Sequence, residues 1–127
     1  MEEIKHTNNP KYKDNLIVAL TFKFALKIIG YTQHLQNNKN FVLSNQLLKS
    51  GTSIGANVRE AQNAESKQDF IHKIKISLKE VDETEYWLLL CQHIDKSETI
   101  EELLTELWTI TKILNKIIST SKNNTIR

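Results

Sequence analysis

Apolar residues recur at helical spacing along most of the chain, most plainly between Ser44 and Gln92. The first part of this stretch carries Leu47, Gly51, Ile54, Val58 and Ala61. The second part carries Phe70, Ile71, Ile74, Leu78, Val81, Leu88 and Leu89. Polar residues fill the positions between them. The pattern predicts two helices joined by a short break near residues 64–66.

Similar patterns on either side of this stretch predict four helices in all. The expected spans are 14–36, 44–64, 66–94 and 97–118, with Asp14, Ser44, Ser66 and either Ser97 or Thr99 as N-caps. Ser66 and Asp69 form a capping box. Residues 1–13 are expected to be a loose arm and 119–127 a frayed tail. Because short loops make neighbouring helices antiparallel, we predict one all-α domain over residues 1–127, an antiparallel up-down-up-down four-helix bundle.

The first helix has two apolar stripes. One consists of Ile17, Leu20, Phe24, Ile28, Tyr31 and Leu35, and the other of Val18, Phe22, Ala25 and Ile29. A surface helix needs only one such stripe. Either the bundle buries this helix deeply or another subunit packs on it. We favour the second explanation, since a small bundle has no central helix, and predict an oligomer interface at the second stripe.

Two glycines, Gly51 and Gly55, lie four residues apart inside the second predicted helix. Each interior glycine costs about 0.5–1 kcal/mol relative to alanine, so a compensating reason is expected. The spacing predicts that a neighbouring helix approaches the backbone closely. The alternative is a tolerated kink.

One residue, Glu85, breaks the apolar pattern of the third helix by falling on its buried side. A carboxylate there needs a partner. We expect an ion pair or hydrogen bond to Lys49 or Arg59. Trp108, on the flank of the last helix, is expected to cover a seam between helices.

Charge is unevenly spread along the chain, although the net charge is only +2. Residues 1–50 hold seven lysines and three acids, whereas residues 76–98 hold two lysines and six acids. The plain interpretation is a pair of solvated helix faces. The sharper one is a dipolar subunit whose basic end meets phosphates, or whose two ends meet each other.

The sequence carries few features of an enzyme or a membrane protein. It has no glycine-rich phosphate loop, no nucleophile elbow and no Glu-x-x-His pattern in the acidic set Glu80, Asp82, Glu83 and Glu85, whose role stays unassigned. His72 could meet Asp69, and His93 could meet Asp95, but both histidines are expected at the surface without a metal. We therefore expect no enzyme activity, cofactor or metal.

No signal peptide is expected in the polar residues 1–15, and no apolar window reaches the roughly 18 residues of a spanning helix. The single cysteine, Cys91, cannot form an internal disulfide. These features favour a cytoplasmic protein without a membrane partner.

Nucleic acid is the partner that the basic residues suggest. The candidate phosphate-binding residues are Lys11, Lys13, Lys23, Lys27, Lys39 and Lys49. The chain has only two arginines, the residue that base readers favour. Lysines that bind phosphates without reading sequence therefore fit better.

The stretch Ser53-Ile54-Gly55-Ala56-Asn57-Val58-Arg59-Glu60-Ala61 resembles the motif of the four helix bundle proteins, whose founding members are encoded in intervening sequences of bacterial 23S ribosomal RNA genes and are also known as S23 ribosomal proteins. Ser53, Ile54, Asn57 and Glu60 match this motif. The Ser66–Phe70 helix start and the pair Glu83 and Glu85 match further family features. Gly55, Arg59 and Ala61 depart from it.

This resemblance implies a cytoplasmic bacterial bundle that assembles as a homo-oligomeric ring, commonly a pentamer. It also implies kinship with the accessory variability proteins of diversity-generating retroelements, which bind nucleic acid and a reverse transcriptase. We expect a non-enzymatic oligomer that binds ribosomal or other structured RNA through a basic face. The alternative is a protein-interaction scaffold without nucleic-acid binding, and a more remote one is a ligand-binding or hydrolytic bundle with Glu85 in a pocket.

Overall fold

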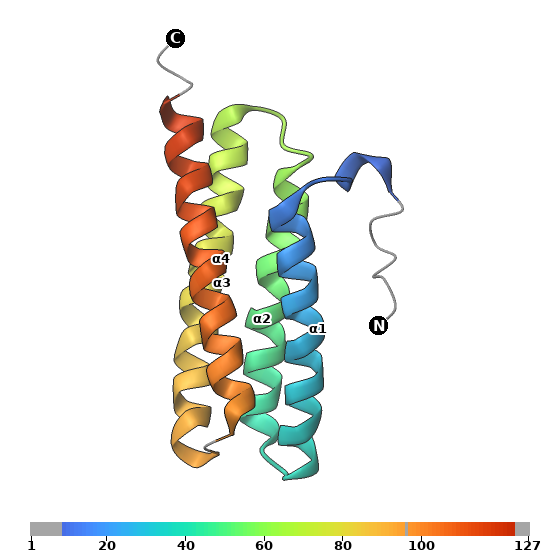
Figure 1. The fold of residues 1–127 in the computed structure, drawn as a ribbon, viewed down its shortest axis with the longest axis vertical. Coiled ribbons are helices and arrows are strands. Elements are labelled where there is room, and N and C mark those ends of the chain that lie inside the picture. The colour runs from blue at the N-terminus through green and yellow to red at the C-terminus, as the bar shows by residue number, and fades with distance from the viewer. Residues whose placement is uncertain (1–8, 96, 124–127) are drawn as a thin grey trace.

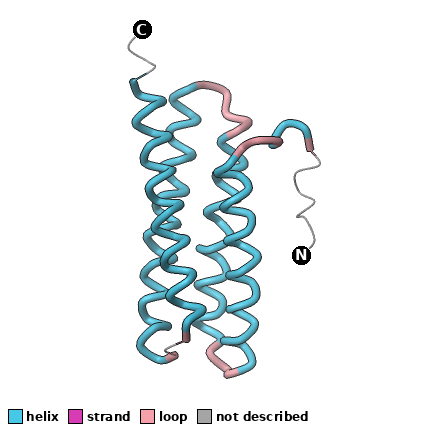
Figure 2. The backbone as a smooth tube through the Cα atoms, viewed as in Figure 1, coloured by secondary structure: helices cyan, strands magenta, loops and turns pink. Residues whose placement is uncertain are grey.

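Four long helices stand side by side in the structure, a computed structural model that describes residues 9–95 and 97–123 (Figure 1). They are α1 (Leu16–Asn37), α2 (Phe41–Ala61), α3 (Lys67–Ile94) and α4 (Glu98–Asn123), preceded by a short 3₁₀ helix, η2 (Pro10–Tyr12). Each helix contacts the next, and α1 also contacts α4. Short loops at the two ends reverse the chain (Figure 2). The predicted all-α up-down-up-down bundle is confirmed.

The core is built from one buried stripe on each helix. Its largest fully buried side chains are Phe24, Ile28, Leu35, Leu47, Ile54, Ile74, Leu88, Ile100, Leu103, Leu107, Ile110 and Leu114. Burying each contributes about 1.5–3 kcal/mol relative to an exposed position. Leu89 differs from the expectation, since it is exposed. The helical rotation instead carries its neighbours Leu88 and Cys91 into the core.

α1 is long and apolar enough, by length and composition, to cross a membrane. Eight of its residues, including Ile17, Phe24 and Ile28, are buried within the bundle. Packing against α2 and α4 therefore covers one side of this apolar helix, while Leu16, Leu26 and Ile29 stay exposed.

The beginnings of α1 and α2 differ from the predictions. Asn15 caps α1, because its side chain accepts a hydrogen bond from the Val18 N–H at 3.2 Å. Asp14 has a left-handed backbone, φ 65°, which turns the chain from η2 into the helix. α2 begins at Phe41, so Ser44 lies inside it.

Ser44 is fully buried and donates from Oγ to the Thr32 carbonyl of α1 at 3.0 Å. Its role is to join two helices, not to cap one. At α3 the predicted cap is confirmed, since Asp69 N–H donates to Ser66 Oγ at 3.0 Å. The Asp69 carboxylate accepts from the Glu65 N–H at 3.2 Å, one residue before the position of a standard capping box.

The chain ends are more ordered than expected where the structure describes them. Tyr12, in the arm expected to be loose, is only 6% exposed. α4 continues through residue 119, the expected start of the frayed tail, as far as Asn123. The rest of both predicted segments, residues 1–8 and 124–127, lies outside the described residues.

The glycine pair of α2 faces α1 at close range, as predicted. A Cβ placed on Gly51 would lie 2.8 Å from Ile28 Cγ2, and one on Gly55 would lie 3.2 Å from the Thr21 carbonyl oxygen. α2 is helical throughout this region. Close packing, and not a kink, is the reason for the two glycines.

Candidate functional site

The antiparallel topology sorts charge along the length of the bundle. The first halves of α1 and α3 lie at the same end as the second halves of α2 and α4, the upper end in Figure 1. We call the described residues 9–26, 52–80 and 111–123 the basic half; they contain eleven Lys or Arg and five Asp or Glu. The acidic half, residues 27–51, 81–95 and 97–110, contains three Lys and eight Asp or Glu. The described chain is therefore strongly dipolar despite its small net charge.

The six predicted phosphate-binding lysines are all exposed, but they divide between the two halves. Lys11, Lys13 and Lys23 lie in the basic half, whereas Lys27, Lys39 and Lys49 lie in the acidic half. Lys27 forms an ion pair with Glu106 of α4. The structure thus brings three of the six together and separates the other three from them.

Most of the basic half comes from residues that lie far apart in the sequence and that the charge pattern along the chain does not group. They are Arg59, Lys67, Lys73, Lys75, Lys79, Lys112, Lys116 and Lys122. They come from three helices and only meet because α2, α3 and α4 alternate in direction. The predicted antiparallel order places the first halves of the first and third helices beside the second halves of the second and fourth. Counting charges in these combined halves would therefore have identified the basic residues from the sequence.

The segment before α1 is held against the end of α2, which adds its cations to the basic half. The Arg59 guanidinium lies over the Tyr12 ring, 4.2 Å from the ring centroid. Asn63 donates to the Tyr12 hydroxyl at 3.4 Å and accepts from the Lys11 ammonium. Lys11 and Arg59 consequently lie at the same end of the bundle.

A groove of about 410 Å³ runs between α1 and α2, and it contains most of the predicted oligomer interface. Its lining residues are Val18, Thr21, Phe22, Ala25, Thr52, Gly55, Ala56 and Arg59. Of the predicted stripe, Val18 is buried, Phe22 and Ala25 are half-buried, and Ile29 is exposed. The chain itself therefore covers part of this stripe and leaves part of it open to a partner.

The residues matching the family motif make contacts within α2, in the core and with α3. Ser53 donates to the Lys49 carbonyl at 2.6 Å, and Asn57 donates to the Ser53 carbonyl at 2.8 Å. Ile54 is fully buried. Glu60 forms an ion pair with Lys73 of α3 at 3.2 Å. These contacts assign structural roles to this stretch.

Glu85 has a different partner from the one predicted. Its carboxylate accepts a hydrogen bond from Trp108 Nε1 of α4 at 2.7 Å, not from Lys49 or Arg59. The reason is geometric: position 85 faces α4, whereas both predicted partners lie on α2. Trp108 spans the α3–α4 seam, in line with its expected role.

Within the acidic set Glu80, Asp82, Glu83 and Glu85, the carboxyl group with a raised pKa is that of Glu80. Burial raises the pKa of Glu80, and the nearby Glu83 carboxylate raises it further, while Lys49 and Lys79 oppose the shift.

No cluster of three His, Cys, Asp or Glu side chains is placed to hold a metal ion in the described residues. His72 and His93 are exposed. Cys91 is fully buried, and burial raises the pKa of its thiol, which disfavours the reactive thiolate.

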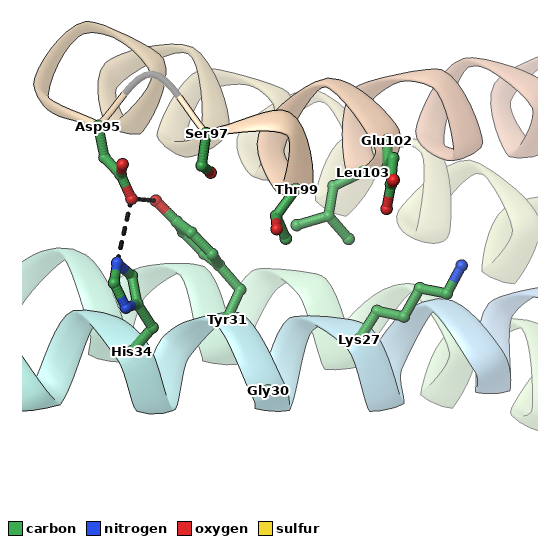
Figure 3. Close-up of a pocket in the computed structure, with 9 residues that line it drawn as sticks. All are labelled: Lys27, Gly30, Tyr31, His34, Asp95, Ser97, Thr99, Glu102 and Leu103. Atoms are coloured by element: carbon green, nitrogen blue, oxygen red, sulfur yellow. Dashed lines mark hydrogen bonds and ion pairs between the residues drawn. The ribbon is translucent and has the colours of Figure 1, made fainter.

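A cleft of about 530 Å³ lies in the acidic half, between α1 and the start of α4 (Figure 3). Its lining residues are Lys27, Gly30, Tyr31, His34, Asp95, Ser97, Thr99, Glu102 and Leu103. Asp95 Oδ2 accepts from the Tyr31 hydroxyl at 3.3 Å and lies 3.1 Å from His34 Nε2. Burial, followed by the charges of Cys91 and Asp95, raises the pKa of Tyr31, so the phenol keeps its proton and donates. Sequence analysis missed this cleft because His34 and Asp95 lie 61 residues apart.

The chain is similar to known proteins both in sequence and in fold. Residues 13–116 match the 23S rRNA-intervening sequence protein family. The fold resembles the crystal structure of a protein of unknown function from the S23 ribosomal protein family of Bacteroides thetaiotaomicron, with 43% sequence identity and a TM-score of 0.77. That match covers 80% of this chain and 97% of the other. No curated protein matches the chain.

Proposed function

The chain belongs to the 23S rRNA-intervening sequence protein family, and from this premise we propose that it is a non-catalytic cytoplasmic protein that binds ribosomal or other structured RNA through its basic half. The observation that carries the proposal is the separation of charge along the bundle. A surface with an excess of six positive charges attracts phosphates, while the acidic half repels them. RNA therefore approaches one end of the molecule.

The kind of cation in the basic half favours binding to the backbone over reading of bases. Ten of its eleven cations are lysines, and the remaining one, Arg59, is stacked on Tyr12. Lys112 and Lys116 lie one turn apart on the exposed surface of α4. Lysine binds phosphate as a point charge, without the planar geometry that arginine offers to guanine. The proposed recognition is thus of RNA shape and charge.

The proposal includes self-association through the groove between α1 and α2. Phe22 and Ala25 line this groove and are only half-buried. Together with the exposed Ile29 they form one apolar stripe along α1. Burying them against a second copy removes apolar surface from water. A ring of copies, the pentamer that the family resemblance implies, would join several basic halves into one rim and strengthen a weak phosphate contact.

The RNA proposal is tested by measuring affinity for a structured RNA as salt is raised. The logarithm of the association constant, plotted against the logarithm of the salt concentration, should fall with a slope of about −0.7 to −0.9 per phosphate contact. We expect the double variant Lys112→Gln, Lys116→Gln to bind more weakly and to reduce the magnitude of that slope by about 1.5. The matched control, Lys39→Gln with Lys49→Gln in the acidic half, should bind as the wild type does.

Two results would contradict the proposal. A flat response between about 50 and 200 mM salt would remove phosphate binding altogether. Equal weakening by both double variants would remove the basic half as its site.

A protein-interaction scaffold is the second candidate, and exposed apolar residues of the acidic half favour it. Phe41, Val42 and Ile94 are 55%, 74% and 58% exposed. Such residues suit a protein surface better than a phosphate backbone. Binding of a protein partner that survives high salt, in a protein with no affinity for RNA, would select this candidate.

A further inference from the structure

We propose that the cleft between α1 and the start of α4 binds an alkylammonium or guanidinium group, with the aliphatic stem of the ligand lying against Tyr31 and Leu103. The group could belong to a free polyamine or to a lysine or arginine side chain of a peptide. This site lies in the acidic half, so the proposal stands independently of RNA binding.

Several donors of the cleft are engaged within the protein. The Tyr31 hydroxyl and His34 Nε2 both point at Asp95 Oδ2, as Figure 3 shows. The Lys27 ammonium is paired with Glu106. The Tyr31 hydroxyl, His34 Nε2 and the Lys27 ammonium are therefore already engaged inside the protein.

The remaining polar groups are carboxylate oxygens, which only accept, and the hydroxyls of Ser97 and Thr99, which can donate or accept. In the described part of the chain, Glu102 has no hydrogen-bond or ion-pair partner, and the second carboxylate oxygen of Asp95 has none either. Ser97 Oγ is shielded from solvent and has no partner among the described residues. An unsatisfied buried hydroxyl is uncommon in a folded protein. A cation that donates hydrogen bonds would engage the carboxylates of Asp95 and Glu102, whereas an anion would be repelled by them.

The charges around the cleft also favour a cation. Asp95 and Glu102 are both acidic, and Glu106 offsets the charge of Lys27. Glu98 and Glu101, in the first turn of α4, do not line the cleft. Lys96 lies outside the described residues. The effect of its charge is measured with the variant Lys96→Ala below.

The walls of the cleft fit a ligand with an aliphatic stem. Leu103 and Tyr31 line it and present small apolar areas beside the oxygens. The volume, about 530 Å³, is within the usual range of small-molecule sites.

Gly30 keeps one wall open, and packing does not explain its presence. Nothing lies within 4 Å of a Cβ placed on it, unlike Gly51 and Gly55. A large side chain at this exposed position would enter the cleft without disturbing the core. Gly30 is thus a convenient place to block the site.

Calorimetric titration with spermidine and with cadaverine tests the proposal, and 1-pentanol serves as an uncharged analogue. We expect both amines to bind and the alcohol not to bind. Glu102→Gln should weaken the amines about tenfold, since it removes one charged contact. Gly30→Leu should abolish binding, while Gly30→Ala, which leaves most of the space, should bind as the wild type does.

Controls separate the cleft from general attraction to acidic surface. Glu101→Gln lies on the same helix turn outside the cleft and should leave the affinities unchanged. Lys96→Ala should strengthen binding or leave it unchanged. Titration with a lysine-containing peptide and with spermidine distinguishes a peptide side chain from a free polyamine. The ligand that binds more tightly identifies the source. Equal losses in Glu101→Gln and Glu102→Gln, or unaltered binding in Gly30→Leu, would overturn the proposal.

Discussion

Gly30 and Gly51 show how the same residue type can serve opposite purposes within helices. Both lie in helix interiors, where glycine is unfavourable. Gly51 meets Ile28 at a distance that leaves no room for a Cβ, whereas Gly30 has open space around it. Contacts in the neighbouring helix, not the local sequence, decide which glycine is needed.

This difference predicts opposite signs for two identical substitutions. Gly30→Ala should raise the free energy of unfolding by about 0.5–1 kcal/mol, because it only removes backbone entropy from the unfolded chain. Gly51→Ala should lower it by about 1–2 kcal/mol, because Ile28 must leave its position. Urea denaturation of both variants measures the two changes. Stabilisation by Gly51→Ala would show that α1 moves away at little cost.

The raised pKa of Glu80 predicts a pH dependence of stability. The native carboxyl keeps its proton above the ordinary value of 4.5, so the native state binds more protons than the unfolded state just above that pH. This group therefore makes the protein less stable as pH rises through the window between its unfolded and native pKa. Denaturation at several pH values measures this effect. Glu80→Gln should lose less free energy of unfolding across this window than the wild type, whereas the exposed control Glu101→Gln should lose as much as the wild type does.

At the scale of helices, periodicity predicted all four elements, but the residues at their ends were harder to assign. Asp14, Asn15 and Ser44 are all good N-cap types, and only Asn15 is used as one. The choice depends on tertiary structure: Asp14 turns the chain out of η2, and Ser44 reaches the Thr32 carbonyl of α1. Neither contact can be read from the local pattern.

The role of Ser44 as an anchor between helices predicts the outcome of its removal. Ser44→Ala should lower the free energy of unfolding by about 1–2 kcal/mol, because it leaves the buried Thr32 carbonyl without this donor. The control is the next residue in the chain, Asn45, which is exposed, and Asn45→Ala should change stability by less than about 0.5 kcal/mol. Circular dichroism should show equal helix content in both variants, and urea denaturation measures the difference between them. Equal stabilities would show that the Ser44 hydroxyl does not anchor α2 to α1.

At the scale of the whole molecule, a dipole was one of two interpretations of the sequence, and the structure groups the charges differently. Charge was grouped by position along the chain, which put Lys39 and Lys49 with Lys11. Alternating helices separate these lysines and bring Lys112 and Lys116 to the basic half instead. The cleft depends on the same long-range meeting of segments. Secondary structure is local enough to predict from sequence, whereas these surfaces require the topology and the rotation of each helix.

The proposed self-association is tested by two substitutions on α1 that start from the same exposure. Ile29 and Leu26 are 46% and 47% exposed, but only Ile29 belongs to the predicted interface stripe. Ile29→Glu should dissociate an oligomer at micromolar concentration, because a buried charge is costly, and Leu26→Glu should leave it intact. Sedimentation velocity distinguishes the two. A wild-type protein that sediments as a monomer would remove the ring.

The sorting of charge also affects how the protein behaves during purification. A sequence isoelectric point near 8.6 suggests retention on a cation exchanger alone at neutral pH. Adsorption, however, depends on the face that a molecule turns toward the resin, and each end of this bundle has an excess of charge of one sign. At low ionic strength the protein should therefore be held by both sulfonate and quaternary-amine columns.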